Sequence, residues 1–254
     1  MRLDGATALI TGASSGIGRA TAQRLAARGV RPVLSGRDPA ALAEVAARTG
    51  GQAIAADLAE AGRAGWLAGE ALRRAGHVDL LVACAGAGWA GELAAMPPAV
   101  AERLVALDLL VPVLLTRALL PGMLARGRGH LVYVASIAGA VGVAGEAVYA
   151  ASKAGLLGFA DSLRAELRGR GVAVTVVLPG AVDTPFFARR GSPYVRGWPA
   201  PVAADRVARA VVRAVARERA EVFVPAWLRL PARLRGGLPG LYRRLARLDP
   251  AARH

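Results

Sequence analysis

The sequence predicts a single doubly wound α/β domain, with a parallel sheet of about seven strands and helices on both faces. Short apolar runs alternate with amphipathic segments through the first 225 residues, which is the pattern of βαβ units. The apolar runs are continuous, as expected of strands that helices cover on both sides. The length of 254 residues suits one large domain of this kind or two small ones.

The expected elements alternate along the chain. Strands are predicted at 6–11, 32–35, 53–56, 78–83, 130–135, 172–178 and 221–224. Helices are predicted at 17–28, 39–48, before about 75, and at 98–126, 148–170 and 201–217. Right-handed crossovers then give the doubly wound arrangement. Residues 1–225 form the predicted domain, and 226–254 form a basic C-terminal extension.

Composition narrows the class of protein. Apolar residues make up 54% of the chain and aromatic residues 5%, so alanine, valine and leucine must build the core. The one cysteine, Cys84, excludes an intrachain disulfide and favours a reducing, cytoplasmic location. The N-terminus lacks the pattern of a signal peptide, and no uncharged run of about 18 apolar residues predicts a membrane span.

The basic residues are unusual in kind and in position. The formal net charge is +15, and it is concentrated in residues 189–254, where arginines far outnumber acids. The chain contains no asparagine, and Lys153 is its only lysine among 33 basic residues. We interpret this as compositional bias, under which a position that keeps lysine is one where arginine would not serve.

A glycine-rich turn, Thr11-Gly12-Ala13-Ser14-Ser15-Gly16-Ile17-Gly18, lies between the first predicted strand and the first helix. Gly12 permits a tight exit from the strand, while Gly16 and Gly18 let the backbone approach a pyrophosphate. The N-terminus of the helix offers free N–H groups and partial positive charge. The turn therefore predicts a dinucleotide site, with a purely structural turn as the alternative.

The second strand ends at Ser35-Gly36-Arg37. NAD sites usually place an acid there, against the ribose 2′-hydroxyl. No acid stands in this turn, and Arg37 is placed to receive a 2′-phosphate, so the sequence favours NADP(H) and leaves NAD(H) open. An ordinary exposed arginine is the alternative. Asp57, after the third strand, is either an acceptor for an adenine amino group or a helix N-cap.

Tyr149 and Lys153 are four residues apart on a predicted helix, so both side chains lie on one face. A free tyrosine has a pKa near ~10 and is a poor base at neutral pH. A nearby ammonium stabilises the phenolate and makes the tyrosine an acid/base group. Ser136 ends the fifth strand, so its hydroxyl reaches the same edge of the sheet, where ligands of such sheets bind.

The glycine turn, the strand-ending Ser136 and Tyr149-x-x-x-Lys153 together resemble the short-chain dehydrogenase/reductase family, over about residues 3–225. The resemblance implies a Rossmann-type domain that interconverts a carbonyl and an alcohol, with Tyr149 as acid/base. Ser136 would orient the reacting oxygen, and Lys153 would bind the nicotinamide ribose. The resemblance implies further cofactor contacts beyond the glycine turn, Arg37 and Asp57, and these fall at Leu58, Ala85, Gly86, Pro179, Gly180, Val182 and Thr184.

Two positions depart from the family pattern. Cys84-Ala85-Gly86 stands where the family usually has Asn-Ala-Gly, and Asp108 stands where an asparagine holds a water of the proton relay. Asp108 is nearly isosteric with asparagine and can still accept from a water. The absence of asparagine throughout the chain favours replacement by compositional bias. A catalytically weakened, cofactor-binding relative with a regulatory or structural role is the second hypothesis.

Other features of the sequence bear on metal binding, substrate and assembly. The three histidines and Cys84 show no metal-ligand spacing, so no metal is expected. Aromatic residues in the loop of about 180–201 favour an apolar substrate; they are Phe186, Phe187, Tyr194 and Trp198. Family resemblance implies a homodimer or homotetramer built partly on helices 98–126 and 148–170.

The basic extension leaves two interpretations open. The leucines at 238, 241, 245 and 248 share one helical face, which predicts either packing on this chain or a partner subunit, or a peripheral membrane contact. Nucleic-acid binding through the net charge lacks any recognition motif and is not expected as the primary role.

Overall fold

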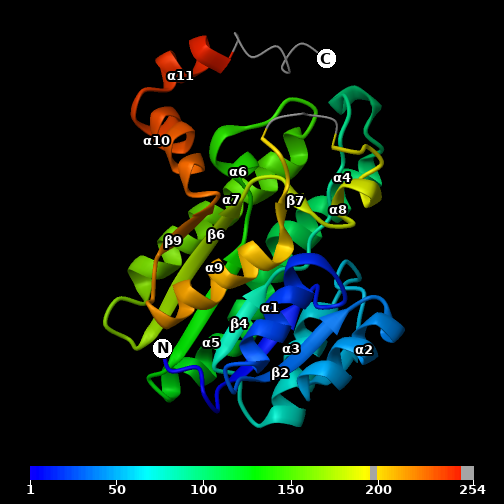
Figure 1. Cartoon of the computed structure of the whole chain (residues 1–254), viewed down its shortest axis with the longest axis vertical. Helices are drawn as coiled ribbons and strands as arrows, with labels where there is room; N and C mark the ends of the chain where they lie inside the picture. Colours follow the sequence, from blue (N-terminus) through cyan, green and yellow to red (C-terminus); the bar gives the residue numbers. More distant parts are fainter. Residues whose placement is uncertain (195–198, 247–254) are drawn as a thin grey trace.

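A computed structural model describes residues 1–194 and 199–246. Its main sheet consists of β1 (Thr7–Thr11), β2 (Arg31–Gly36), β3 (Gln52–Ala55), β4 (Leu80–Ala83), β5 (Gly129–Val134), β6 (Val172–Pro179) and β9 (Glu221–Val224). The strand order is β3-β2-β1-β4-β5-β6-β9, and every neighbouring pair is parallel (Figure 1). The predicted doubly wound sheet of about seven strands is confirmed.

Helices cover both faces of the sheet (Figure 1). One face carries α1 (Gly16–Ala26), α2 (Pro39–Thr49) and α9 (Ala204–Ala216). The other carries α3 (Arg63–Ala75), α5 (Val111–Ala125) and α7 (Ala147–Glu166). Side chains alternate between the two cores along each strand, so in β1 Leu9 faces the second layer while Ala8 and Ile10 face the first.

The long predicted helix 98–126 is interrupted. It consists of α4 (Pro98–Val105), a π-helical turn at Ala106–Leu110, and α5. By length and composition alone, the segment Pro98–Ala125 could cross a membrane. Leu104, Leu107 and Leu115 are buried inside the domain, so this helix belongs to the core. No second such helix occurs within residues 1–194 and 199–246.

The remaining elements are short and lie beyond the carboxyl ends of the strands. They are α6 (Ile137–Val141), α8 (Phe186–Arg189), and a two-stranded sheet of β7 (Val182–Asp183) and β8 (Val202–Ala203). In its described residues, the segment predicted as an irregular loop at about 180–201 thus contains the helical turn α8 and the strand β7, which pairs with β8 just beyond it. Trp198 lies outside the described residues.

The C-terminal extension differs from the prediction that the leucines at 238, 241, 245 and 248 share one helical face. A 3₁₀ turn at Ala226–Leu228 leads into α10 (Arg229–Gly237), and α11 (Pro239–Ala246) follows after a break at Leu238. Both helices project from the carboxyl-end side of the domain (Figure 1). Leu248 lies outside the described residues.

Candidate active site

One cavity of about 1020 Å³ opens at the carboxyl ends of the parallel strands. This is the crevice in which doubly wound sheets bind ligands, between β1 and β4 where the strand order reverses. The residues predicted from sequence as catalytic or cofactor-binding all line it. They are Gly12, Ser14, Ser15, Gly16, Ile17, Gly18, Arg37, Asp57, Leu58, Ala85, Gly86, Asp108, Ser136, Tyr149, Lys153, Pro179, Gly180, Val182 and Thr184.

The glycine turn packs too closely for side chains. A Cβ at Gly18 would lie 2.2 Å from the carbonyl oxygen of Gly12, so only glycine lets α1 begin this near β1. Ser15 is the N-cap of α1 but makes no side-chain capping bond, which leaves the helix N-terminus open toward the cavity. Thr11 Oγ1 accepts from the N–H groups of Cys84 and Ala85, each at 3.0 Å, and ties the turn to β4. This cradle of uncapped amides fits a dinucleotide phosphate.

The far end of the cavity lies at the tips of β2 and β3. Arg37 is exposed and lines the cavity next to Gly36. Asp57 accepts from the N–H of Ala59 at 3.1 Å and from Arg103 Nη2 at 2.8 Å. Burial is the largest single effect and works to raise the pKa of Asp57, but the hydrogen bonds from Arg103 and Ala59 and the charges of Arg103 and Arg37 together keep the pKa below its usual value. No helix begins at Asp57, so its interpretation as an N-cap is wrong.

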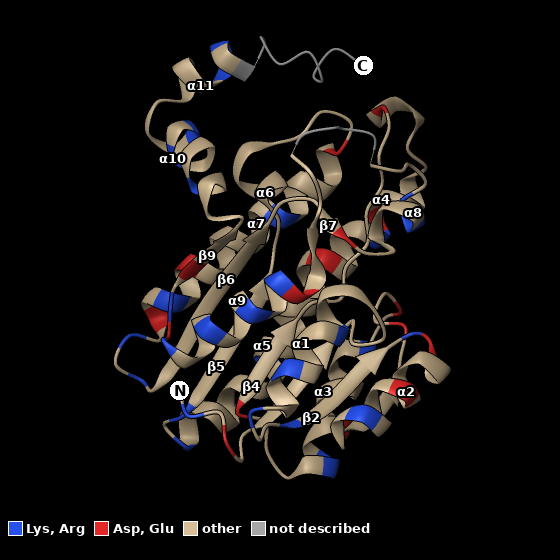
Figure 2. Cartoon of the chain, viewed as in Figure 1, with Lys and Arg blue, Asp and Glu red and all other residues tan. Residues whose placement is uncertain are grey.

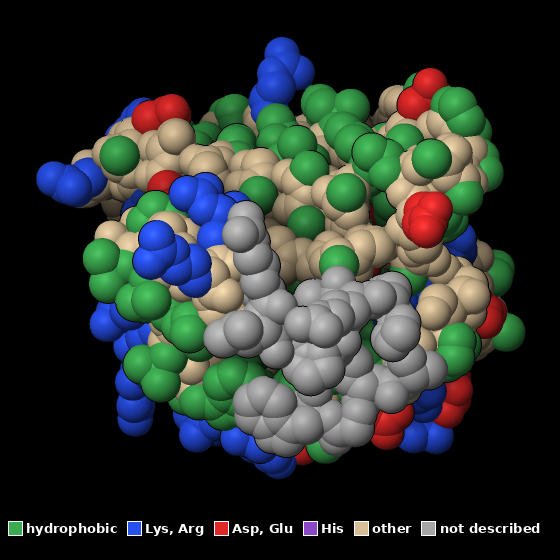
Figure 3. Space-filling view, turned by 90° about the horizontal axis from the view of Figure 1, so that it is seen from above, with side chains coloured by type: hydrophobic (Ala, Val, Ile, Leu, Met, Phe, Trp, Pro, Cys, Tyr) green, Lys and Arg blue, Asp and Glu red, His purple; other side chains and the backbone are tan. Residues whose placement is uncertain are grey.

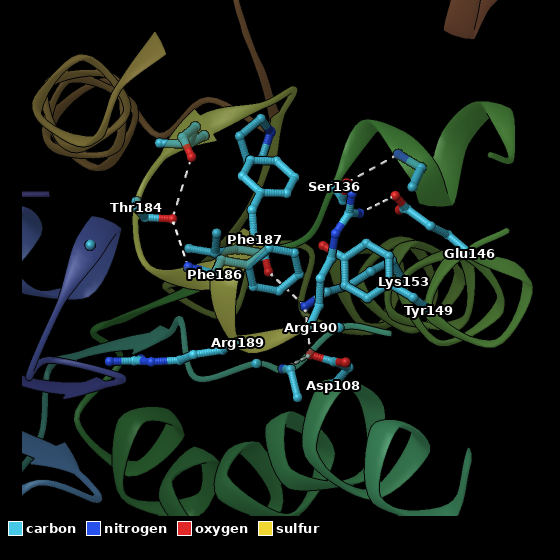
Figure 4. Close-up of a pocket in the computed structure, with 18 of the residues that line it drawn as sticks. Asp108, Ser136, Glu146, Tyr149, Lys153, Thr184, Phe186, Phe187, Arg189 and Arg190 are labelled. Carbon is cyan, nitrogen blue, oxygen red and sulfur yellow. Dashed lines mark hydrogen bonds and ion pairs between the residues drawn. The ribbon is translucent and has the colours of Figure 1, made fainter. Parts of the chain in front are cut away.

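Tyr149 and Lys153 lie on α7 and face Ser136, the N-cap of α6 (Figure 4). The Ser136 side chain is close enough to the Tyr149 hydroxyl to act to lower its pKa. Lys153 Nζ donates to the carbonyl oxygen of Val134 at 3.2 Å and lies 5.7 Å from the Tyr149 ring centroid. All three side chains are buried, so their mutual electrostatic effects are weakly screened.

Asp108 reaches this cluster from the π-helical turn. Its Oδ1 lies 3.2 Å from Lys153 Nζ and accepts from the N–H of Ala87 at 3.2 Å. A Cβ at Gly86 would lie 2.6 Å from Oδ1, so a glycine lets the segment after β4 pass this close to the carboxylate. The extra residue of a π turn commonly redirects side chains at functional sites. Here the turn carries a fully buried Asp108 in the relay position.

The charges of this cluster act on one another. Burial raises the pKa of Tyr149; the ammonium of Lys153 opposes this rise, and the carboxylate of Asp108 adds to it. Burial also raises the pKa of Asp108, against the effect of Lys153. Burial alone would lower the pKa of Lys153, but Asp108 and Tyr149 outweigh it and raise the pKa. Lys153 is therefore a firmly protonated ammonium beside the tyrosine.

Aromatic rings from α8 and the segment after it form the wall opposite Tyr149 (Figure 4). The centroids of Phe186 and Tyr149 are 5.6 Å apart, those of Phe186 and Phe187 are 5.7 Å apart, and those of Phe187 and Tyr194 are 5.1 Å apart. The predicted apolar character of this loop agrees with these contacts. The rings make an apolar surface next to the reacting oxygen's position.

Three charged residues of the cavity were not singled out from the sequence. Arg190 pairs with Glu146, just before α7, and lies 4.7 Å from the Phe187 ring centroid. Arg189 Nη1 donates to Ser15 Oγ at 3.2 Å, and so reaches from α8 across to the glycine turn. The partners are 44 and 174 residues apart, so no local spacing could have revealed them. The pair Arg189-Arg190, one residue after Phe186-Phe187, was the only signal.

A metal centre and a cysteine nucleophile find no support in this geometry. Residues 1–194 and 199–246 hold no group of three or more histidine, cysteine or acidic side chains placed for a metal. Burial raises the pKa of the Cys84 thiol to about 12, so it stays protonated at neutral pH.

Comparison with known proteins identifies the class. A family model described as short chain dehydrogenase matches residues 6–194. The chain therefore belongs to the short-chain dehydrogenase/reductase family, whose members act on CH–OH and C=O groups. The resemblance seen in the sequence is confirmed.

Individual relatives show how far the likeness extends. The "Dehydrogenase/reductase SDR family member 7B" of Bos taurus is 36% identical over 190 residues, which cover 70% of this chain and 58% of that protein. The chain thus spans about three fifths of that relative. The "1-deoxy-11-beta-hydroxypentalenate dehydrogenase" of Streptomyces exfoliatus is 37% identical over 262 residues, covering 99% and 94%.

Solved structures agree with the fold and with nicotinamide binding. A short-chain dehydrogenase from Sphingobium yanoikuyae in complex with NADPH is 30% identical, with a TM-score of 0.82 and coverage of 96% and 95%. A family member from Burkholderia phymatum in complex with NAD is 28% identical, with a TM-score of 0.84 and coverage of 95% and 96%. Both of these structures hold a nicotinamide cofactor and share the fold of this chain.

Proposed function

We propose that this chain interconverts an apolar ketone or aldehyde and its alcohol with NADP(H), using Tyr149 as the general acid/base. The observation that carries the proposal is the grouping of the buried Tyr149 with Ser136 and with the ammonium of Lys153, both of which act to lower the pKa of the tyrosine. These groups meet at the carboxyl edge of the sheet, inside the cavity that the uncapped turn also lines.

The protein groups divide the work of the reaction. Ser136 and Tyr149 hold the substrate oxygen, and in reduction Tyr149 donates its proton to that oxygen. Lys153 is held by Val134 and Asp108, so its charge favours the phenolate that remains. The bound nicotinamide supplies or accepts the hydride, and its oxidised ring adds positive charge. In oxidation the same phenolate takes the proton back.

Support for NADP(H) comes from two arginines that line the cavity, Arg37 and Arg189. Arg37 is exposed at the tip of β2, and Gly36 leaves no carboxylate there to meet a ribose 2′-hydroxyl. A guanidinium pairs well with a phosphate in a bidentate geometry. Arg189 adds a second cation beside Ser15, suited to the diphosphate.

Substrate selection is assigned to the aromatic wall of Phe186, Phe187 and Tyr194. Arg190 and Glu146 fasten this wall to the start of α7, which carries Tyr149. The pair neutralises itself, so the surface beside Tyr149 offers an apolar substrate no uncompensated charge.

Oxidation of NADPH by the purified chain, followed against a panel of apolar ketones and aldehydes, tests the proposal. We expect turnover that Tyr149→Phe abolishes while NADPH still binds. A chain that binds NADPH tightly, turns over no member of a broad panel and behaves identically as Tyr149→Phe would instead be the cofactor-binding relative with a regulatory or structural role.

Assembly and location complete the proposal. We assign a homodimer or homotetramer that uses α4, α5 and α7; Val105, at the end of α4, and Leu110, in the π-helical turn before α5, are exposed apolar residues there. Static light scattering checks the mass, and a monomer would refute the assignment.

The lone cysteine supports a reducing, cytoplasmic location.

A further inference from the structure

The C-terminal surface, defined as residues 226–246, combines exposed leucines with arginines. The exposed fractions are 71% for Leu230, 57% for Leu238, 46% for Leu241 and 49% for Leu245. Large side chains of this kind are normally buried or meet a partner when they gather in one place. The same residues include Arg229, Arg233, Arg235, Arg243 and Arg244 and no acidic residue.

One side of this surface is fixed to the domain. Arg235 Nη1 donates to the carbonyl oxygen of Ala140 at 2.8 Å, and the Tyr242 hydroxyl donates to that of Val141 at 3.4 Å. Arg229 lies 5.7 Å from the Phe223 ring centroid. These contacts hold α10 and α11 against α6 and β9. The leucines are exposed, as are Arg233, Arg243 and Arg244. Figure 2 shows basic positions along α10 and α11, and Figure 3 shows basic and hydrophobic side chains side by side on this end of the molecule.

We infer that the C-terminal surface docks on an anionic membrane surface. Arginines attract anionic headgroups, and leucines beside them can enter the boundary between headgroups and acyl chains. A nucleic acid would satisfy the arginines but would leave the leucines in water. A second copy of this chain would satisfy the leucines, but a two-fold contact would place the same acid-free arginine surfaces against each other.

The position of the C-terminal surface determines which end of the domain faces the bilayer. Leu228, directly before α10, lines the catalytic cavity, and α10 packs on the helix that Ser136 caps. The C-terminal surface and the cavity therefore lie at the same end of the domain. Docking places the cavity beside the bilayer, where apolar carbonyl compounds dissolve. This step rests on the proposed function, whereas the docking itself does not.

Flotation of the full chain with vesicles tests the docking. One set of vesicles contains phosphatidylglycerol and phosphatidylcholine, and the other contains phosphatidylcholine alone. The test variant is Arg233→Gln, Arg243→Gln and Arg244→Gln, which leaves Arg229 and Arg235 to hold the helices. Its matched control changes the same charge at the amino ends of the strands, at the exposed Arg28, Arg168 and Arg170.

We expect the wild type and the control variant to float with anionic vesicles and not with neutral ones. At roughly fivefold per arginine, the loss of three arginines should make the test variant partition about a hundredfold more weakly. No flotation of the wild type, or an equal loss in the control variant, overturns the inference. The assay measures protein in the floated layer, so its failure leaves the proposed function standing.

A second variant separates a membrane from other partners. Leu238→Ser, Leu241→Ser and Leu245→Ser should weaken flotation while mass by light scattering and the thermal unfolding midpoint stay unchanged. A fall in mass would show that the surface joins copies of the chain and would overturn the inference. Binding of the wild type to a DNA duplex in place of vesicles would overturn it as well.

Discussion

Replacing Asp108 by asparagine isolates the charge in the relay position. The carboxylate lies 3.2 Å from Lys153 Nζ and raises the pKa of Tyr149. Asparagine keeps an oxygen acceptor for Lys153 and for the N–H of Ala87, and it removes the negative charge. The change should therefore leave Lys153 in place and let more of its charge act on Tyr149.

Two distances in the structure give the size of the effect. Lys153 Nζ is 5.7 Å from the Tyr149 ring centroid, which at an effective dielectric constant of about 20 corresponds to about 3 kcal/mol of attraction to the phenolate. Asp108 Oδ1 is then at most about 9 Å from that centroid and repels the phenolate by about 2 kcal/mol. Because about 1.4 kcal/mol is tenfold, we expect roughly a five- to thirtyfold gain.

The assay is the pH dependence of kcat/KM for alcohol oxidation. Oxidation needs the phenolate, so the rate rises with pH through the pKa of Tyr149. Removing the Asp108 charge lowers that pKa, so the rising limb moves to lower pH and the gain appears on that limb. Asp79→Asn is the matched control, because Asp79 is also buried but lies at the amino ends of the strands, away from the cavity. Superimposable profiles for Asp108→Asn and the wild type would refute the electrostatic argument.

Three further predictions concern the same cavity. Lys153→Arg should lower kcat about a hundredfold or more, the scale of general acid–base catalysis, because a planar guanidinium is a poor substitute for the compact ammonium that contacts Val134 and Asp108; a near-normal rate with an intact fold would contradict the mechanism. Arg37→Ala should weaken NADPH binding about ten- to hundredfold, the worth of a charged hydrogen bond, and leave NADH binding unchanged, as measured by nucleotide fluorescence; equal losses would argue against a 2′-phosphate contact. Glu146→Gln should raise KM for an apolar ketone several-fold with little change in NADPH affinity, because it leaves the charge of Arg190 unpaired beside the aromatic wall. The double variant Glu146→Gln, Arg190→Met should restore KM. An unchanged KM in the single variant would contradict this role.

Much of the fold could be predicted because its signals are local. Seven apolar runs marked seven strands, and parallel strands bring their carboxyl ends to one edge. That rule alone gathers Gly12, Ser136 and Pro179 around one cavity. Tyr149 and Lys153 came from helical spacing, which the observed α7 preserves.

What the sequence did not predict depends on contacts between distant segments or on very short elements. The pair of Arg190 with Glu146 and the contact of Arg189 with Ser15 leave no periodic pattern. The five-residue helix α6 is too short for helical periodicity to show. The π-helical turn has the same residue types as a continuous helix, so only the structure shows how Asp108 is turned inward.

Because Lys153 is the single lysine of the chain, cleavage at that residue can report the opening of helix α7. An endoproteinase specific for lysine has one target bond, after Lys153, and cleavage there gives only the fragments 1–153 and 154–254. Lys153 is buried in the middle of α7, so the bond becomes accessible only when that helix opens. The rate of this one cut thus follows the stability of the active-site helix, while trypsin samples arginines over the whole surface. NADPH that binds the closed form should slow the cut in proportion to the bound fraction, which gives an affinity measurement without any substrate.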